Sequence, residues 1–181
     1  MEIEDHALKS QFQQLEKSKM FLIDLIHSLP PEKYRQQPVP QSWSIAQAVN
    51  HLFLCEKLLL AYQRKKISYP ETLPKYHLKS WFAMYTYKVI LSSFIKVKAP
   101  GPINMWENQE IMAPDELDEK WAAQRKELFD FLKQQYPQFK NHLVFRHPSG
   151  GRLNINHMLI FFNDHILHHT RQVKRILKEI S

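Results

Sequence analysis

The chain has 181 residues, 44% of them hydrophobic and 24% charged, and its formal net charge is +7 at pH 7. This size suits a single domain over residues 1–181, and the composition excludes a disordered chain. The only glycines are Gly101, Gly150 and Gly151, which form neither a Walker P-loop nor a GxGxxG motif. All-β folds also need more glycine for their hairpin turns. The composition therefore favours helices.

The remaining composition predicts a cytoplasmic protein. No apolar run approaches the roughly 18 residues of a membrane span, and the first residues, MEIED, are acidic where a signal peptide is basic. Cys55 is the only cysteine, which excludes an intrachain disulfide. Acidic residues are interspersed with the basic ones, so the charge favours a solvated basic surface. We therefore expect neither a membrane partner nor a nucleic-acid partner.

Prolines divide the chain into helix-sized segments. Proline inside a helix costs about 3 kcal/mol, so proline-free stretches mark where long helices can form. The eleven prolines leave five such windows, which are residues 1–29, 41–69, 75–99, 115–136 and 149–181. The sequence thus predicts an all-α fold of five helical segments. Pro-rich connectors join them, including a long one over residues 98–114.

The first, second and fourth windows each carry an apolar stripe with the 3.6-residue period of a helix. In chain order the stripes contain Leu8, Phe12, Leu15, Leu22, Leu25 and Ile26, then Ile45, Val49, Leu52, Leu59 and Leu60, then Trp121, Leu128, Phe131 and Leu132. Ser44 and Gln47 form a capping box at the start of the second helix. The third window is aromatic over much of its circumference between residues 79 and 95, which suits a central helix or one that faces another subunit.

The last window predicts a short extended arm over residues 143–151, a turn, and a helix capped by Asn154. Two histidines of this helix, His165 and His169, occupy positions that a core normally fills with leucine. The full apolar face contains Met158, Phe162, His165, His169, Val173 and Ile176. Imidazoles four residues apart share one helical face and can bind one cation. A third ligand could come from His51 in the second window.

A second interpretation of these histidines stays open on spacing alone. His165 and His169 can be core histidines satisfied by hydrogen bonds, with His51 an unrelated boundary residue. Two further histidines, His157 and His168, are predicted on the outer side of the last helix, either in solvent or in contact with a ligand residue.

Two motifs resemble a known family. Residues 42–52, SWSIAQAVNHL, are followed a hundred residues later by HPSGGRLNINHMLIFFNDHILHHTRQVKRIL, and this combination is similar to the DinB-like superfamily of metal-binding bundles. The resemblance implies an up-down four-helix bundle with an additional helix and Pro-rich connectors. It implies His51, His165 and His169 as metal ligands, with Gln172 at the position that follows them in the family. It also implies zinc or nickel as the cofactor, and a homodimer.

Three neutral imidazoles with an open coordination position would let a divalent ion activate water or bind a thiol. The resemblance accordingly implies a hydrolase, or a transferase that moves a low-molecular-weight thiol onto a small-molecule substrate. Binding should weaken below about pH 6.5, where imidazoles take up protons. Zinc proteases place a glutamate directly after the first histidine of the pair, whereas this chain has Ile166, which excludes that mechanism.

Two residues near His51 leave alternatives open. Glu56 is the one candidate for a catalytic base. The alternative is that its carboxylate only makes structural hydrogen bonds. Cys55 is either a fourth ligand that closes the site or a small buried residue. A closed site would suit a non-catalytic bundle with a structural or vestigial metal, acting as an interaction module through its aromatic third window.

Overall fold

The computed structural model describes residues 3–76, 110–147 and 151–181. In chain order the elements are α1 (His6–His27), α2 (Pro31–Arg35), α3 (Ile45–Ile67), the 3-10 helix η1 (Pro70–Thr72), α6 (Pro114–Phe139), β1 (Phe145–His147), β2 (Gly151–Leu153) and α7 (Ile155–Glu179). The helix predicted from the third window and the connector as far as residue 109 lie outside the described residues.

The predicted caps of the second and last helices are confirmed. The Ser44 hydroxyl accepts from the Gln47 backbone N–H at 3.2 Å, and the Gln47 side chain accepts from the Ser44 N–H at 2.8 Å, which completes the capping box of α3. Asn154 caps α7 by accepting from the His157 N–H at 2.9 Å. Asp5 does the same for α1. Each cap satisfies backbone donors that the first helical turn leaves without partners.

The fourth helix is longer than its proline-free window. The window ends at residue 136, but α6 continues through Pro137 to Phe139, and the Lys140 N–H closes the last turn on the Tyr136 carbonyl at 2.9 Å. A proline this close to a C-terminus removes one helical hydrogen bond only. Tyr136 and Phe139 are both buried in the core, and their burial offsets that loss.

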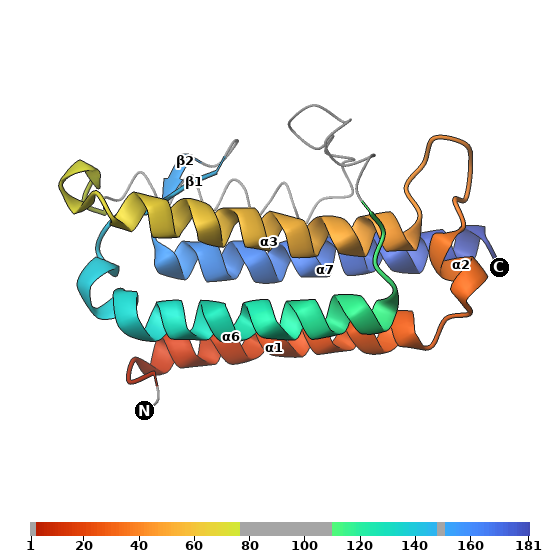
Figure 1. Ribbon diagram of the computed structural model, residues 1–181, viewed down its shortest axis with the longest axis horizontal. Coiled ribbons are helices and arrows are strands. Elements are labelled where there is room, and N and C mark those ends of the chain that lie inside the picture. Colours follow the sequence, from red (N-terminus) through yellow and green to blue (C-terminus); the bar gives the residue numbers. More distant parts are fainter. Residues whose placement is uncertain (1–2, 77–109, 148–150) are drawn as a thin grey trace.

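The long helices form a four-helix bundle, as predicted. Around the bundle, α1 packs against α7, α7 against α3, α3 against α6, and α6 against α1. Figure 1 shows that α1 and α7 run in one direction, while α3 and α6 run in the opposite direction. Along the chain the directions are therefore up, down, down, up, without the strict alternation of a simple up-down bundle. As antiparallel neighbours, α3 and α7 bring the beginning of α3 beside the second half of α7.

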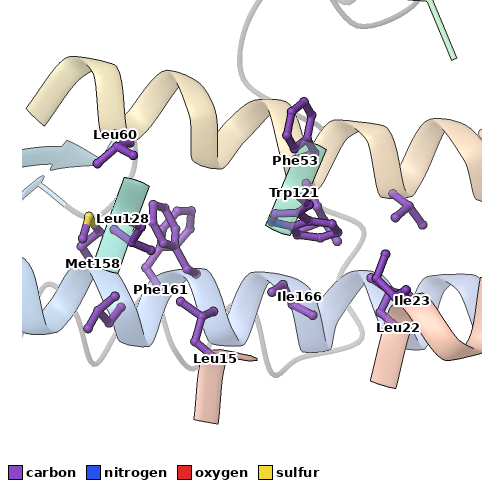
Figure 2. Packing of buried hydrophobic residues seen from close by; sticks show 14 of the residues in the cluster. Leu15, Leu22, Ile23, Phe53, Leu60, Trp121, Leu128, Met158, Phe161 and Ile166 are labelled. Atoms are coloured by element: carbon purple, nitrogen blue, oxygen red, sulfur yellow. The ribbon is translucent and has the colours of Figure 1, made fainter. Parts of the chain in front are cut away.

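The predicted apolar stripes meet in the centre of the bundle. Figure 2 shows side chains from all four long helices converging, among them Leu15, Phe53, Trp121 and Ile166. Every residue of the three stripes is buried or packs against the buried cluster. In the described part of the chain, we find no helix whose length and apolar character would suit a bilayer.

The predicted arm is a two-stranded antiparallel hairpin, in which Phe145 of β1 pairs with Leu153 of β2. Gly151 opens β2 with a φ of 73°, a left-handed conformation that favours glycine. The hairpin packs against α3, and the Phe145 ring lies 5.8 Å from that of Phe161 on α7. The arm thus covers the first half of α7.

The end of the long connector is fixed to α3. The Met112 N–H donates to the Asn50 side-chain oxygen at 3.2 Å, and the Tyr34 hydroxyl donates to the Met112 carbonyl at 3.4 Å. All three residues are buried. The described end of the connector is therefore held against α3 at Asn50, the residue before His51.

Candidate metal centre

The structure brings together the three histidines predicted to bind metal. His51 comes from α3, and His165 and His169 come from consecutive turns of α7. The ring centroids are 5.3 Å apart for His51 and His165, 5.1 Å for His51 and His169, and 4.7 Å for His165 and His169. One ligating nitrogen from each ring lies within 4.8 Å of the others. The antiparallel packing of α3 and α7 produces this meeting.

Burial keeps two of these imidazoles, His51 and His169, neutral. His51, His165 and His169 are 8%, 9% and 7% exposed. Burial lowers the pKa of His51 from 6.5 to about 4. The pKa of His169 lies well below its usual value, first because of burial and then because of charges on His51 and His168. Neutral imidazole is the form that binds a metal ion, so His51 and His169 need to lose no proton at pH 7.

Neighbouring rings frame the cluster on two sides. Trp43, directly before the cap of α3, lies 5.1 Å from the His51 ring and 6.3 Å from the His169 ring, nearly parallel to the latter at 13°. Phe161 stacks on His165 at 5.3 Å. Sequence reasoning assigned no role to Trp43, although its position beside the Ser44 cap fixes where the indole can lie.

His165 and His169 already have the nitrogen spacing that a divalent ion requires, and His51 has a ligating nitrogen within 4.8 Å of both. In a tetrahedral site with metal–nitrogen bonds of about 2.0–2.1 Å, ligand nitrogens lie roughly 3.3 Å apart. The Nε2 atoms of His165 and His169 are 3.1 Å apart before any ion is considered. The donor set is borderline in softness, which suits zinc, nickel and similar first-row ions.

Cys55 lies beside the cluster without belonging to it. Its Sγ atom is 3.5 Å from His51 Nε2 and 3.7 Å from His51 Nδ1, but the group of mutually close ligand atoms consists of the three histidines. Burial, with a smaller contribution from the charge of Glu56, raises the pKa of the thiol to about 12. Cys55 is therefore a protonated thiol at pH 7.

Glu56 faces α6, whereas His51 on the same helix faces α7. One carboxylate oxygen accepts from the Trp121 indole at 2.8 Å, and the other accepts from Arg125 at 2.8 Å. Arg125 also pairs with Glu16 of α1 at 3.1 Å. The structure thus shows the hydrogen-bonded alternative for Glu56, which links α3 to α6, and it places the carboxylate outside the three-histidine group.

The prediction for His157 is wrong. This residue was expected on the outer side of α7, in solvent or in contact with a ligand residue, but it is only 7% exposed and its ring lies 5.6 Å from that of Tyr76. The chain segment that follows η1 covers this side of α7, which the helical period by itself did not indicate. His168 is half-buried, and its ring lies 5.3 Å from that of His169. Of the two alternatives predicted for His168, the structure therefore shows contact with one of the three histidines.

The lowered pKa of His51 predicts how stability depends on pH in the metal-free protein. Between about pH 6.5 and pH 4 the unfolded chain binds a proton at His51 and the folded chain does not, so stability falls as the pH is lowered through this range. His51 alone should cost about 3 kcal/mol by pH 4 and nothing above pH 7.5. Urea denaturation of protein stripped by a chelator measures this slope. A His51→Gln variant with an unchanged slope would contradict the assignment.

Comparisons with known proteins agree with this fold. The solved structure of YfiT from Bacillus subtilis, titled a probable metal-dependent hydrolase with an unusual four-helix bundle topology, is similar to this chain with a TM-score of 0.59. The two chains are 14% identical, and the similarity covers 99% of this chain and 91% of YfiT. No curated protein matches the chain. The family model of the DinB superfamily matches residues 14–173, and the chain therefore belongs to the DinB superfamily.

Proposed function

We propose that this protein is a metal-dependent enzyme in which His51, His165 and His169 hold one divalent ion, zinc or nickel, and leave a coordination position for a small-molecule substrate. The observation that carries the proposal is the meeting of three buried imidazoles, with ligating nitrogens within 4.8 Å of one another, on two packed helices. Rigid helices hold such ligands more accurately than loops do.

The residues around the ion determine what it can do. A divalent ion held by three imidazoles can lower the pKa of a bound water towards 7 or hold a thiol as its thiolate. Imidazoles bind a metal ion as neutral rings, so the three ligands would not offset the charge of the ion. Glu56 would not offset it either, because its carboxylate pairs with Arg125. Trp43 and Phe161 keep water from two sides of the cluster. The chain thus supplies an apolar site in which an anionic oxygen or sulfur donor is strongly favoured.

We infer hydrolysis as the first reaction class, because YfiT carries the description of a probable metal-dependent hydrolase. Transfer of a low-molecular-weight thiol is the second, because a thiolate would offset the charge that the neutral ligands leave. We also propose that the protein is a homodimer and is located in the cytoplasm, as the sequence predicts.

The competing proposal is a closed structural site in a non-catalytic interaction module. It requires Cys55 to become a fourth ligand, and the Cys55 thiol lies close enough to His51 for this alternative to need a direct test. Cobalt reports both outcomes, because cobalt–thiolate coordination and the number of ligands each change its absorption spectrum.

The test uses purified full-length protein. We expect about one zinc or nickel ion per chain, and a cobalt-substituted protein whose spectrum shifts when azide or a small thiol is added, because a ligand position is open. Cys55→Ser should bind cobalt equally and give the same spectrum. A thiolate band in the wild type that Cys55→Ser removes, without response to azide, would establish the closed site. A protein that binds neither zinc, nickel nor cobalt would overturn the proposal.

A further inference from the structure

Gln172 makes the shortest polar contact to His169. Its side-chain oxygen Oε1 lies 2.8 Å from His169 Nδ1. A carbonyl oxygen can only accept a hydrogen bond, so His169 Nδ1 carries the hydrogen. In a neutral ring the lone pair is then on Nε2, the atom that faces His165 Nε2 at 3.1 Å.

We propose that Gln172 is a positioning residue that holds His169 in the one tautomer and ring orientation that present Nε2 to the metal ion. This inference rests on the proposed function, because it assigns a role towards the ion that the three histidines would bind. The family resemblance gave the position of Gln172 in the sequence but assigned no role to its side chain.

The stacking contact with Trp43 does not define the orientation of the His169 ring. Trp43 stacks against the ring at 13°, and that contact is kept if the ring turns over by 180° about the Cβ–Cγ bond. A turned ring would place a carbon atom against Gln172 Oε1 and another carbon atom towards His165. The polar contacts to Gln172 and His165 distinguish the two orientations, and of these only Gln172 fixes the tautomer, because its oxygen can only accept whereas His165 Nε2 can donate or accept.

The position of Gln172 on α7 makes this contact pre-formed. Residues three apart on a helix lie on the same side, so Gln172 reaches His169 without any movement of the backbone. Gln172 is half-buried, which limits competition from water for its oxygen. Partners of this kind fix ligand orientation, and their loss typically weakens metal binding 10–100-fold.

The experiment compares variants that remove or keep the acceptor. Gln172→Leu and Gln172→Met fill the same volume without an acceptor, Gln172→Glu keeps one, and Arg175→Leu controls for an apolar change on the exposed side of α7. The first readout is the tautomer of His169 in the metal-free protein, from long-range proton–nitrogen NMR correlations. The second is zinc affinity, by competition with a chromophoric chelator. Circular dichroism confirms that each variant is folded.

We expect the hydrogen on Nδ1 in the wild type and in Gln172→Glu, and a mixture of tautomers in Gln172→Leu and Gln172→Met. Zinc affinity should fall 10–100-fold in the two apolar variants and should be kept in Gln172→Glu and Arg175→Leu. An unchanged tautomer and affinity in whichever apolar variant folds would overturn the inference. A wild type that binds neither zinc, nickel nor cobalt, yet shows the Gln172-dependent tautomer, would instead overturn the proposed function.

Discussion

Replacing His169 with alanine is expected to weaken zinc or nickel binding about 100-fold or more, and to leave purified protein largely free of metal. Zinc sites with four ligands bind with about 10–16 kcal/mol, so each ligand contributes roughly 3 kcal/mol, which corresponds to a factor of at least 100. His169 is the histidine closest to both others, at 4.7 Å and 5.1 Å between ring centroids. Elemental analysis and chelator competition measure the effect.

The neighbouring residue offers a matched control. His168 is on the same helix and contacts the His169 ring, but it does not belong to the three-histidine group. His168→Ala should therefore keep about the wild-type metal content. Equal metal loss in both variants would mean that the helix was disturbed. Full metal retention in His169→Ala would exclude this ligand set and return these residues to ordinary core histidines.

Replacing Arg125 with methionine is expected to lower the free energy of unfolding by about 3–5 kcal/mol at pH 7. Arg125 is 3% exposed and pairs with Glu56, which is 2% exposed, at 2.8 Å, while it also pairs with Glu16 at 3.1 Å. Without the guanidinium, the Glu56 carboxylate would stay buried with its negative charge uncompensated. Breaking a buried pair in this way is much more costly than replacing both partners.

The loss should be smaller at pH 5 than at pH 7. Burial already raises the pKa of Glu56, against the opposing effect of Arg125, and loss of Arg125 should raise it further. The folded variant would then take up a proton as the pH falls, at a pH where the unfolded chain does not, and this uptake favours folding. Denaturant titrations at both pH values measure the difference.

A second ion pair between the same two helices serves as the control. Arg64 and Glu127 are 3.0 Å apart, but their side chains are 49% and 59% exposed. Arg64→Met should therefore change the free energy of unfolding by no more than about 1 kcal/mol. If both arginine variants were equally mild, the Glu56–Arg125 pair would not be the stabilising link between α3 and α6 that its burial indicates.

The local features of this protein followed from its sequence. The capping box of Ser44 and Gln47, the Asn154 cap and the apolar stripes depend on residues within a few positions of each other, and the structure confirms them. The placement of His165 and His169 on the buried face of the last helix followed in the same way, because a four-residue spacing fixes a shared face. The one wrong helix end, at residue 136, also has a local reason, because Pro137 removes only one backbone hydrogen bond from the last turn of α6.

The tertiary structure alone decided which faces meet. That His51 joins His165 and His169 depends on α3 and α7 being antiparallel neighbours. The packing of α6 against α3 places Arg125 beside Glu56, outside the group of three histidines. The burial of His157 depends on a segment from a different part of the chain. Helical periodicity gives each side chain an angle around its own helix, but contacts between helices require their directions and rotations, which packing of the whole core determines.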